Sequence, residues 1–546
     1  MEKKSVGRSF FSGVLILTAA NLIVKVIGLL YKIPLTNMLG DEGMGYFNTA
    51  YQIYSYLYMF STAGLPVAMS MMISRMNAEG RQADKRKLLL LTLCVFLTVG
   101  LAGSVIMAFC CRGLADFISA DLSYLCILAI SPALFFVCIS STLRGYFQGH
   151  SNMLPTAVSE ILESVGKAAL GLLLGGYALK QGLPIYQVAA YSIIGVSAGV
   201  AAGAVFLTLA KLLGKREPSS VPENIATDVT KTVTDSKELL IKLFSIAIPV
   251  MISASLLSMS SMLDTLIIIR RLIETGVTES AAIAMYGNYT AYCVTLFNLP
   301  PVLIYPIVNS LIPIVSSSKA KGDEKRAEGI MHTALRLSAV IALPCAFGLA
   351  TLSEPILKLI FKNGASAEMA APLLTLLAPS IFLIGVMAVS NGILQSCGMQ
   401  KYTLISMPAG AVVKALGAYF LPALTVGGTT LKMYAAPIST FAFYLTVTAI
   451  NFFFIVKYTG LRISVMRIYL RPFIASVTCA VSAAGCYLLL RNGIGNKLSV
   501  LLAITVAALI YAVALLLLGA VTREELEMLP MGKKIAPILS SLKLLK

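Results

Sequence analysis

The chain has 546 residues, of which 58% are hydrophobic and 12% charged, and its mean hydropathy is +0.85. A soluble globular domain carries about a quarter charged residues, so this composition excludes one. The net charge of +18 is explained by Lys and Arg in the loops on one side of a membrane. A nucleic-acid partner is not expected, because the sequence has no platform of basic and aromatic residues for bases.

The residues that usually carry metal or catalytic chemistry are sparse. The chain has ten cysteines, without a Cys-x-x-Cys pair, and two histidines. We interpret the cysteines as small buried hydrophobes and expect no metal site. The sequence also has no phosphate-binding loop of the type Gly-x-x-x-x-Gly-Lys-Ser/Thr and no nucleophile motif. It therefore predicts neither an enzyme nor an ATP-driven pump, and no cofactor.

Taken in chain order, the apolar runs are long enough to cross the hydrocarbon core as helices, which takes roughly 20 residues. They predict an all-α polytopic membrane protein with about fourteen transmembrane helices. The predicted helices lie near 10–36, 46–74, 88–111, 122–143, 156–179, 186–213, 238–269, 281–315, 332–352, 370–396, 401–421, 432–456, 468–490 and 498–519. The first run is too long for the core of a signal peptide, so we expect a retained helix.

The distribution of positive charge predicts the orientation. Most of the 43 Lys and Arg residues fall in the two tails and in every second connection between the predicted helices. The positive-inside rule assigns these parts to the cytoplasm. We therefore expect a multi-pass protein of the bacterial cytoplasmic membrane with both termini in the cytoplasm.

The longest polar stretch separates two halves of similar sequence. Residue types recur at a constant spacing in the second and eighth predicted helices, and again in the fourth and fifth against the tenth and eleventh. The matching pairs include Tyr46 and Tyr286, Asn48 and Asn288, Pro66 and Pro306, Gly145 and Gly392, and Lys167 and Lys414. Such a parallel repeat predicts two six-helix lobes around a central cleft. We expect an N-terminal lobe (1–213), a cytoplasmic linker (214–237), a C-terminal lobe (238–456), and two extra helices with a cytoplasmic tail (457–546).

Four lysines within apolar segments are candidate binding residues for an anionic substrate. Lys25 lies in the middle of the first predicted helix, where a cation costs about 2.5–3.5 kcal/mol. Lys32 lies two turns further along the same face, and it could instead extend to the interface. Lys167 and Lys414 are related by the repeat. The alternative for these lysines is a structural ion pair, and Glu163 stands four residues before Lys167, in the favourable order.

Asp264, in the seventh predicted helix, is an intramembrane carboxylate. It could bind a coupling cation or pair with a lysine, and Glu163 is a second candidate for such a role. Several prolines interrupt predicted helices where a transporter could bend, although static kinks would look the same in sequence. The candidate hinge residues are Pro66, Pro300, Pro301 and Pro306.

Four short stretches resemble a known family. They are Lys25-Val-Ile-Gly-Leu-Leu-Tyr-Lys-Ile-Pro, Ser61-Thr-Ala-Gly-Leu-Pro-Val-Ala, Leu143-Arg-Gly-Tyr-Phe-Gln-Gly and Gly392-Ile-Leu-Gln-Ser. The chain resembles the multidrug/oligosaccharidyl-lipid/polysaccharide (MOP) exporter superfamily. Within it, the chain is similar to the polysaccharide-transporter branch of stage V sporulation protein B and the Gram-positive MurJ-type lipid II flippases. The likeness covers nearly the whole chain.

The resemblance implies a flippase that moves undecaprenyl-pyrophosphate-linked peptidoglycan precursor (lipid II) by alternating access. The membrane potential or an ion gradient would drive it, and cell-wall synthesis proteins are candidate partners. Lys25 matches a cavity arginine of Gram-negative relatives. Other arginines of that pattern are missing, since the second predicted helix reads Tyr54-Ser55-Tyr56-Leu57-Tyr58. Either other lysines hold the phosphate or the carrier differs.

Three further hypotheses remain open at this point. The chain could move another lipid-linked polysaccharide repeat unit, or export drugs coupled to a cation. A drug exporter would favour buried carboxylates over lysines. The chain could also be a scaffold for cell-wall or spore-cortex assembly that transports nothing. Such a scaffold would not need charges in the middle of the membrane.

Overall fold

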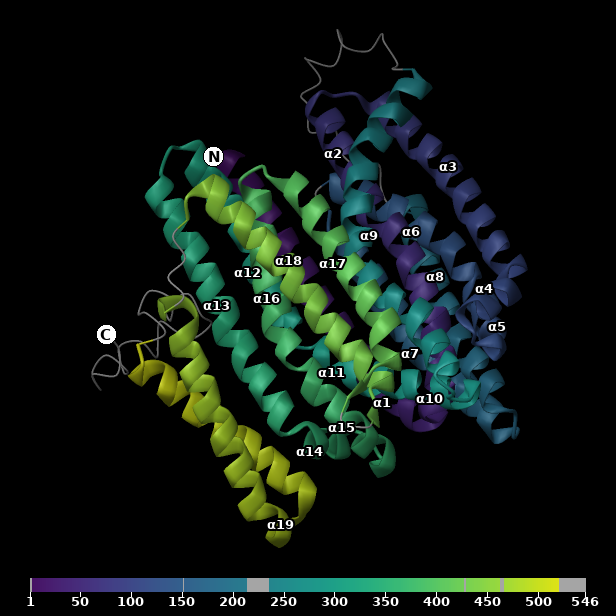
Figure 1. The fold of residues 1–546 in the computed structure, drawn as a ribbon. Coiled ribbons are helices and arrows are strands. Elements are labelled where there is room, and N and C mark those ends of the chain that lie inside the picture. The colour runs from purple at the N-terminus through teal and green to yellow at the C-terminus, as the bar shows by residue number, and fades with distance from the viewer. Residues whose placement is uncertain (1, 151, 214–234, 427–428, 462–465, 520–546) are drawn as a thin grey trace. The chain divides into compact units, whose positions relative to one another are not determined.

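The computed structural model describes residues 2–150, 152–213, 235–426, 429–461 and 466–519 (Figure 1). Nearly all of these residues are helical, which confirms the predicted all-α class. The exception is a short hairpin of β1 (Thr425–Val426) and β2 (Thr429–Thr430). The chain divides into two compact units, Met1–Gly287 and Asn288–Lys546.

The first unit consists of helices α1 to α10. Their bounds are α1 (Glu2–Ala63), α2 (Leu65–Ala78), α3 (Gln82–Phe109), α4 (Cys111–Ile118), α5 (Tyr124–Ile130), α6 (Pro132–Gly149), α7 (Leu154–Lys180), α8 (Ile185–Leu213), α9 (Ser236–Glu274) and α10 (Glu279–Asn288), with a 3-10 turn at Asp121–Ser123. α9 packs against α1, α2, α3 and α4, so it belongs to this unit.

The second unit begins with a π-helical turn at Tyr289–Cys293. Its helices are α11 (Val294–Phe297), α12 (Pro301–Ala320), α13 (Glu324–Thr351), α14 (Ser353–Ile360), α15 (Gly364–Leu377), α16 (Pro379–Ser396), α17 (Gln400–Phe420), α18 (Ala435–Thr459) and α19 (Arg471–Leu517), with short turns at Leu421–Ala423, Lys432–Tyr434 and Met466–Leu470. α16 packs against α12, α13 and α18, and α19 packs against α13. The Tyr511 hydroxyl of α19 donates a hydrogen bond to the Val340 carbonyl of α13 at 2.7 Å.

Ten helices among the described residues are long and apolar enough to span a membrane. Two of them each cover two predicted segments. α1 continues through Gly40 (φ 64°, ψ −172°), and α19 continues through Gly495 (φ 76°, ψ 167°). Only glycine adopts these backbone angles readily, so each marks a break between two helical stretches. The count of fourteen stays a prediction.

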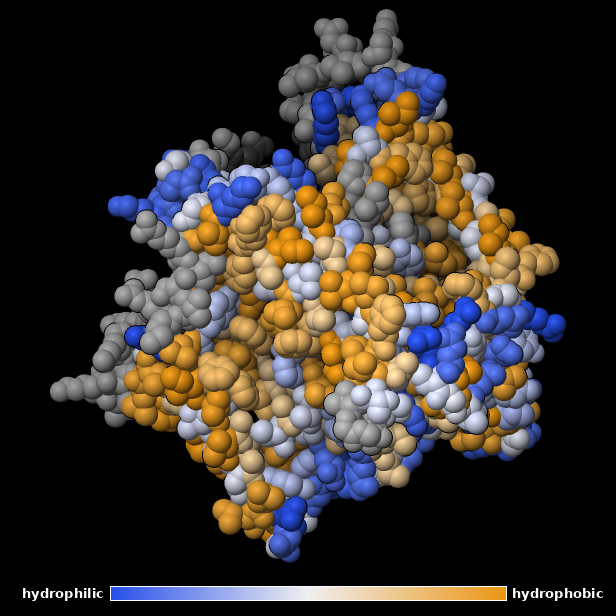
Figure 2. Space-filling view, viewed as in Figure 1, coloured by the Kyte–Doolittle hydropathy of each residue, from blue (hydrophilic) through white to orange (hydrophobic). Residues whose placement is uncertain are grey.

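The surface of the helices is strongly apolar. Figure 2 shows apolar side chains covering most of the helix shafts that face the viewer, and hydrophilic side chains gathered near helix ends. Large hydrophobic residues are exposed in both units, including Phe109 at 86% and Leu489 at 84%. A soluble protein rarely exposes contiguous apolar surface of this extent, whereas a bilayer solvates it. The protein is therefore a multi-pass membrane protein.

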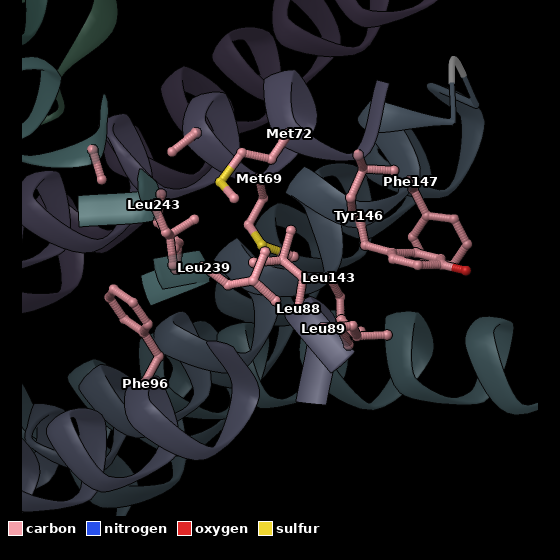
Figure 3. Packing of buried hydrophobic residues seen from close by; sticks show 14 of the residues in the cluster. Met69, Met72, Leu88, Leu89, Phe96, Leu143, Tyr146, Phe147, Leu239 and Leu243 are labelled. Carbon is pink, nitrogen blue, oxygen red and sulfur yellow. The ribbon is translucent and has the colours of Figure 1, made fainter. Parts of the chain in front are cut away.

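A buried cluster holds α2, α3, α6 and α9 together within the first unit (Figure 3). Met69 of α2 and Leu243 of α9 are fully buried in it. α6 approaches α2 closely because Gly145 has no side chain: a Cβ there would lie 2.8 Å from the Pro66 Cα. At the turn after α2, Arg75 and Arg81 bond Glu79, and these hydrogen bonds lower the pKa of its carboxyl.

A row of glycines joins α7 and α8. A Cβ on Gly195 would lie 2.3 Å from the Gly171 nitrogen, and a Cβ on Gly199 would lie 2.5 Å from the Glu163 carbonyl oxygen and 2.7 Å from the Lys167 nitrogen. The two backbones are therefore in direct contact. Since Glu163 and Lys167 are part of this contact, the glycines of α8 fix the position of the charged part of α7.

We expect Gly199→Ala to destabilise the protein. The added methyl group must displace the backbone of α7, and overpacking of this kind costs about 1–3 kcal/mol. The thermal unfolding midpoint of the purified protein in detergent measures the effect. Gly176→Ala on α7 is the matched control, because a Cβ there meets nothing within 4 Å. Equal midpoints for the two variants would contradict the close contact.

Candidate functional site

α7 carries three charged residues on one face. Glu160, Glu163 and Lys167 follow one another at intervals of three and four residues, which places them on the same side of a helix. α7 packs against α1 and α8. Glycines of α8 cover one side of α7, and the charged side chains meet groups from α1 and α6.

The part of α1 that follows Gly40 contributes a column of aromatic rings. The centroids of Phe47 and Tyr51 lie 6.1 Å apart, those of Tyr51 and Tyr54 lie 6.0 Å apart, and those of Tyr54 and Tyr58 lie 5.7 Å apart. The spacing of three and four residues brings these side chains onto one face of the helix. Tyrosine suits this place because its ring is apolar while its hydroxyl can meet a charged neighbour.

Lys167 is held by tyrosines. Its ammonium group donates a hydrogen bond to the Tyr51 hydroxyl at 3.1 Å. The Lys167 Nζ also lies 4.5 Å from the ring centroid of Tyr51 and 5.9 Å from that of Tyr31, within the range of a cation–π contact. Within the described part of the chain, these contacts of Lys167 are all with neutral groups and none is with a carboxylate.

Arg144 of α6 is shared between two carboxylates of α7. Its guanidinium donates a hydrogen bond to Glu163 Oε2 at 2.9 Å and a second to the Ser159 hydroxyl at 3.1 Å. Glu160 Oε1 is more distant, at 4.0 Å. The Arg144 side chain is 7% exposed, and Tyr58 of α1 interacts with it. Arg144 therefore links α6, α7 and α1.

Lys32 joins the two helical stretches of α1. Its ammonium group donates a hydrogen bond to Asn48 Oδ1 at 2.9 Å, and the two residues lie on opposite sides of the break at Gly40. Lys32 and Lys167 are near enough to repel each other. Together these groups form a site that we call the α1–α7 column, made of Lys32, Asn48, Tyr51, Tyr54, Tyr58, Arg144, Glu160, Glu163 and Lys167.

The structure brings three of the predicted site residues together, namely Lys32, Lys167 and Glu163. Lys25 is exposed on α1, where its charge acts on the Tyr51 hydroxyl from outside the column. Lys414 belongs to the second unit. It is 1% exposed, and it donates a hydrogen bond to the Thr440 hydroxyl of α18 at 3.0 Å. Substrate binding by these four lysines stays a prediction.

Asp264 is buried on α9, where its charge acts on the Tyr286 hydroxyl of α10. The next residue, Thr265, shares a hydrogen bond of 2.6 Å with the Tyr286 hydroxyl of α10. The predicted hinge prolines lie at or near helix starts: Pro66 in the first turn of α2, Pro300 just before α12, Pro301 at its first residue and Pro306 inside α12. Coupling by Asp264 and bending at these prolines stay predictions.

Sequence reasoning missed six members of the column as site residues: Asn48, Tyr51, Tyr54, Tyr58, Arg144 and Glu160. Arg144 entered only as part of a motif, and Glu160 was not considered. The signal that could have found Glu160 is the helical spacing of Glu160, Glu163 and Lys167. No sequence pattern pairs Arg144 with Glu163, which follows 19 residues later on another helix. Among the described residues, no group of three or more His, Cys, Asp or Glu side chains could hold a metal ion.

The fold is that of a multi-pass membrane protein with charged residues buried between its helices. Comparison with known proteins assigns it to a class of transporters. The lipid II flippase MurJ in its inward closed conformation aligns with a TM-score of 0.67 at 14% identity, over 92% of this chain and 98% of the flippase. The chain belongs to the polysaccharide biosynthesis protein family, which matches residues 10–319, within the MOP superfamily. A second family, MatE, matches residues 249–420.

Two relatives from Bacillus subtilis (strain 168) cover most of the chain. Stage V sporulation protein B is 24% identical over 528 residues, which are 96% of this chain and 98% of the relative. The lipid II flippase MurJ is 26% identical over 421 residues, which are 74% of this chain and 75% of the relative. The resemblance deduced from the sequence motifs is thereby confirmed.

Removing Arg144 should destabilise the first unit, because Arg144→Met leaves Glu163, whose side chain is 20% exposed, without its partner. Leaving a charged acceptor unpaired in such a partly buried place costs about 1–3 kcal/mol. The double variant Arg144→Met/Glu163→Met should unfold at a higher temperature than Arg144→Met alone. Thermal unfolding in detergent measures both.

The control for this comparison is Arg75→Met. Arg75 pairs with Glu79, but its side chain is 81% exposed, and exposed pairs contribute little to stability. Its unfolding midpoint should match that of the natural chain. A double variant that is no more stable than Arg144→Met would refute a buried ion pair.

Proposed function

We propose that this protein is a flippase that moves an undecaprenyl-pyrophosphate-linked peptidoglycan precursor, lipid II, from the cytoplasmic to the outer leaflet by alternating access. Membership of the polysaccharide biosynthesis protein family and similarity to the lipid II flippase MurJ support transport of a lipid-linked precursor. Among such precursors we propose lipid II, and we propose the bacterial cytoplasmic membrane as the location of the protein.

One observation carries the proposal: Lys32 and Lys167 touch neutral groups only, within the described part of the chain. Lys32 bonds an amide oxygen, and Lys167 bonds a phenol and two aromatic rings. A cation without a carboxylate partner inside a transmembrane helix is costly and marks a substrate or ion pathway. Two such cations near each other attract an anion, and a pyrophosphate suits them.

The tyrosines of α1 are compatible with this role. Tyr51 holds Lys167 in place, and the stretch from Tyr54 to Tyr58 is the one in which the resemblance implies arginines in Gram-negative relatives. The anion would then be bound by lysines brought by α1 and α7, whereas the relatives would use arginines of the second transmembrane helix. Lys25, exposed on the same helix as Lys32, would meet the anion first. Lys414 would be the counterpart of Lys167 in the second unit.

The negative charge of the proposed substrate indicates what drives its transport. Moving one elementary charge across the membrane potential is worth about 2.3 kcal/mol per 100 mV. An anionic headgroup carried outward from a negative interior is therefore driven by the potential itself. Both termini would lie in the cytoplasm, as the positive-inside rule indicates.

Complementation tests this function. In cells depleted of their own lipid II flippase, the natural chain should restore growth and lipid II exposed on the outer leaflet. Lys32→Ala/Lys167→Ala should lower the exposed lipid II at least tenfold, because the anion loses both cations. Lys180→Ala is the matched control, since Lys180 is exposed at the far end of α7, and it should transport normally.

The other outcomes separate the alternatives. If the expressed natural chain does not restore exposed lipid II, the substrate is not lipid II. Transport of a different lipid-linked saccharide would then identify a flippase for another repeat unit. Drug resistance in a sensitised host would identify a drug exporter of the same superfamily. Full activity of the double lysine variant would refute anion binding at the α1–α7 column.

A further inference from the structure

Two carboxylates of α7 compete for one guanidinium. Glu163 accepts the short hydrogen bond of 2.9 Å from Arg144, whereas the closest approach of Glu160 is 4.0 Å. The second oxygen of Glu160, Oε2, is buried and has no hydrogen-bond partner among the described residues. A buried carboxylate oxygen without a partner carries the full cost of desolvation if it is charged.

Among the residues that the structure describes, Arg144 is the one positive charge that acts on Glu160. α6 contributes Arg144, α1 contributes the hydroxyls of Tyr54 and Tyr58, and α7 itself contributes Glu163. α8 faces this part of α7 with Gly199 and Gly203. With both carboxyls ionised, the group around Arg144 has a net charge of −1. With one of them protonated, it is neutral, which a low-dielectric environment favours.

We propose that Glu160 is a proton-binding site. A proton from the aqueous phase binds the carboxylate at Oε2, converting Glu160 to the neutral acid, while Glu163 stays ionised and keeps Arg144. Glu160 lies six residues after the start of α7, about 9 Å along its axis. The acid can then donate a hydrogen bond from Oε2, so the buried oxygen is no longer a charged acceptor.

A proton fits this place better than a metal ion. Hard cations such as Ca²⁺ and Mg²⁺ take six or more oxygen ligands in ordered geometry. The guanidinium of Arg144 lies 4.0 Å from Glu160 Oε1, and it repels a cation. A proton needs only the single orphaned oxygen.

Protonation of Glu160 changes the charge that an anionic substrate meets. The column holds three cations, Lys32, Lys167 and Arg144, and two carboxylates, which gives +1 with both ionised and +2 with Glu160 protonated. An anion should therefore bind the protonated column more tightly, and by linkage the anion favours proton binding. This step rests on the proposed function, whereas the proton site itself does not.

Infrared spectroscopy of the full chain in lipid nanodiscs tests the proton site directly. At pH 7, the natural chain minus Glu160→Gln difference spectrum should contain the carbonyl stretch of a protonated carboxyl. The difference for Glu274→Gln, an exposed residue paired with Arg270 and Arg271, should contain ionised carboxylate bands only. Ionised carboxylate bands in the Glu160→Gln difference would overturn the proposal.

A second variant keeps the test decisive if Glu160→Gln does not fold. Glu163→Gln leaves Arg144 to Glu160 alone, so Glu160 should ionise and its carbonyl band should disappear. Persistence of the band in Glu163→Gln would mean that the band does not come from competition for Arg144, and it would also overturn the proposal.

Binding of undecaprenyl pyrophosphate to the nanodisc-embedded chain tests the linkage. Over the pH range in which the Glu160 band is lost, binding should weaken by about fivefold or more in the natural chain. In Glu160→Gln, the part of the pH dependence that accompanies loss of the band should be absent, so binding should change less with pH than in the natural chain. Binding with the same pH dependence in both chains would overturn the linkage. No binding at any pH would instead refute the proposed function, and the infrared result would still decide the proton site.

Discussion

A charged side chain within an apolar helix must be neutralised, hydrated or bound by a ligand, and this requirement governs the placement of α7. α7 carries charge on one face, and a buried charge without a partner is costly in an apolar environment. α6 supplies a guanidinium and α1 supplies phenols to that face. On the other side, glycines of α8 allow backbone contact. The charged face sets the rotation of α7, and the glycines set its distance from α8.

Much of this arrangement could be predicted from the sequence, because it depends on composition and on local periodicity. The long apolar runs predict the all-helical membrane class, and Lys167 is conspicuous as a charge within one of them. The partners of Lys167 and Glu163 could not be predicted. Tyr51 lies 116 residues before Lys167, and no local pattern specifies which helix packs against which. The favourable spacing of Glu163 and Lys167 suggests a helical ion pair, but Glu163 bonds Arg144, whose fork of donors is the stronger partner.

The internal repeat also does not predict which residues surround each repeated lysine. Lys167 and Lys414 occupy equivalent positions in sequence, and both are held by hydroxyl groups. Lys167 is half-buried against rings of another helix, whereas Lys414 is fully buried against Thr440. The repeat therefore preserves the position of a cation in each unit but not its exposure. A duplicated helix can keep its fold while its contacts change.

The spacing of Glu160, Glu163 and Lys167 has a consequence for how the length of α7 can vary. Consecutive residues of an α-helix are rotated by about 100°. One residue inserted or deleted between Glu160 and Lys167 would turn one end of the charged face by that angle, toward lipid or toward the glycines of α8. Neither environment accepts an ion. Length changes within this family should therefore accumulate in the loops at the ends of α7, while the segment between Glu160 and Lys167 keeps its length even where the residues themselves are exchanged.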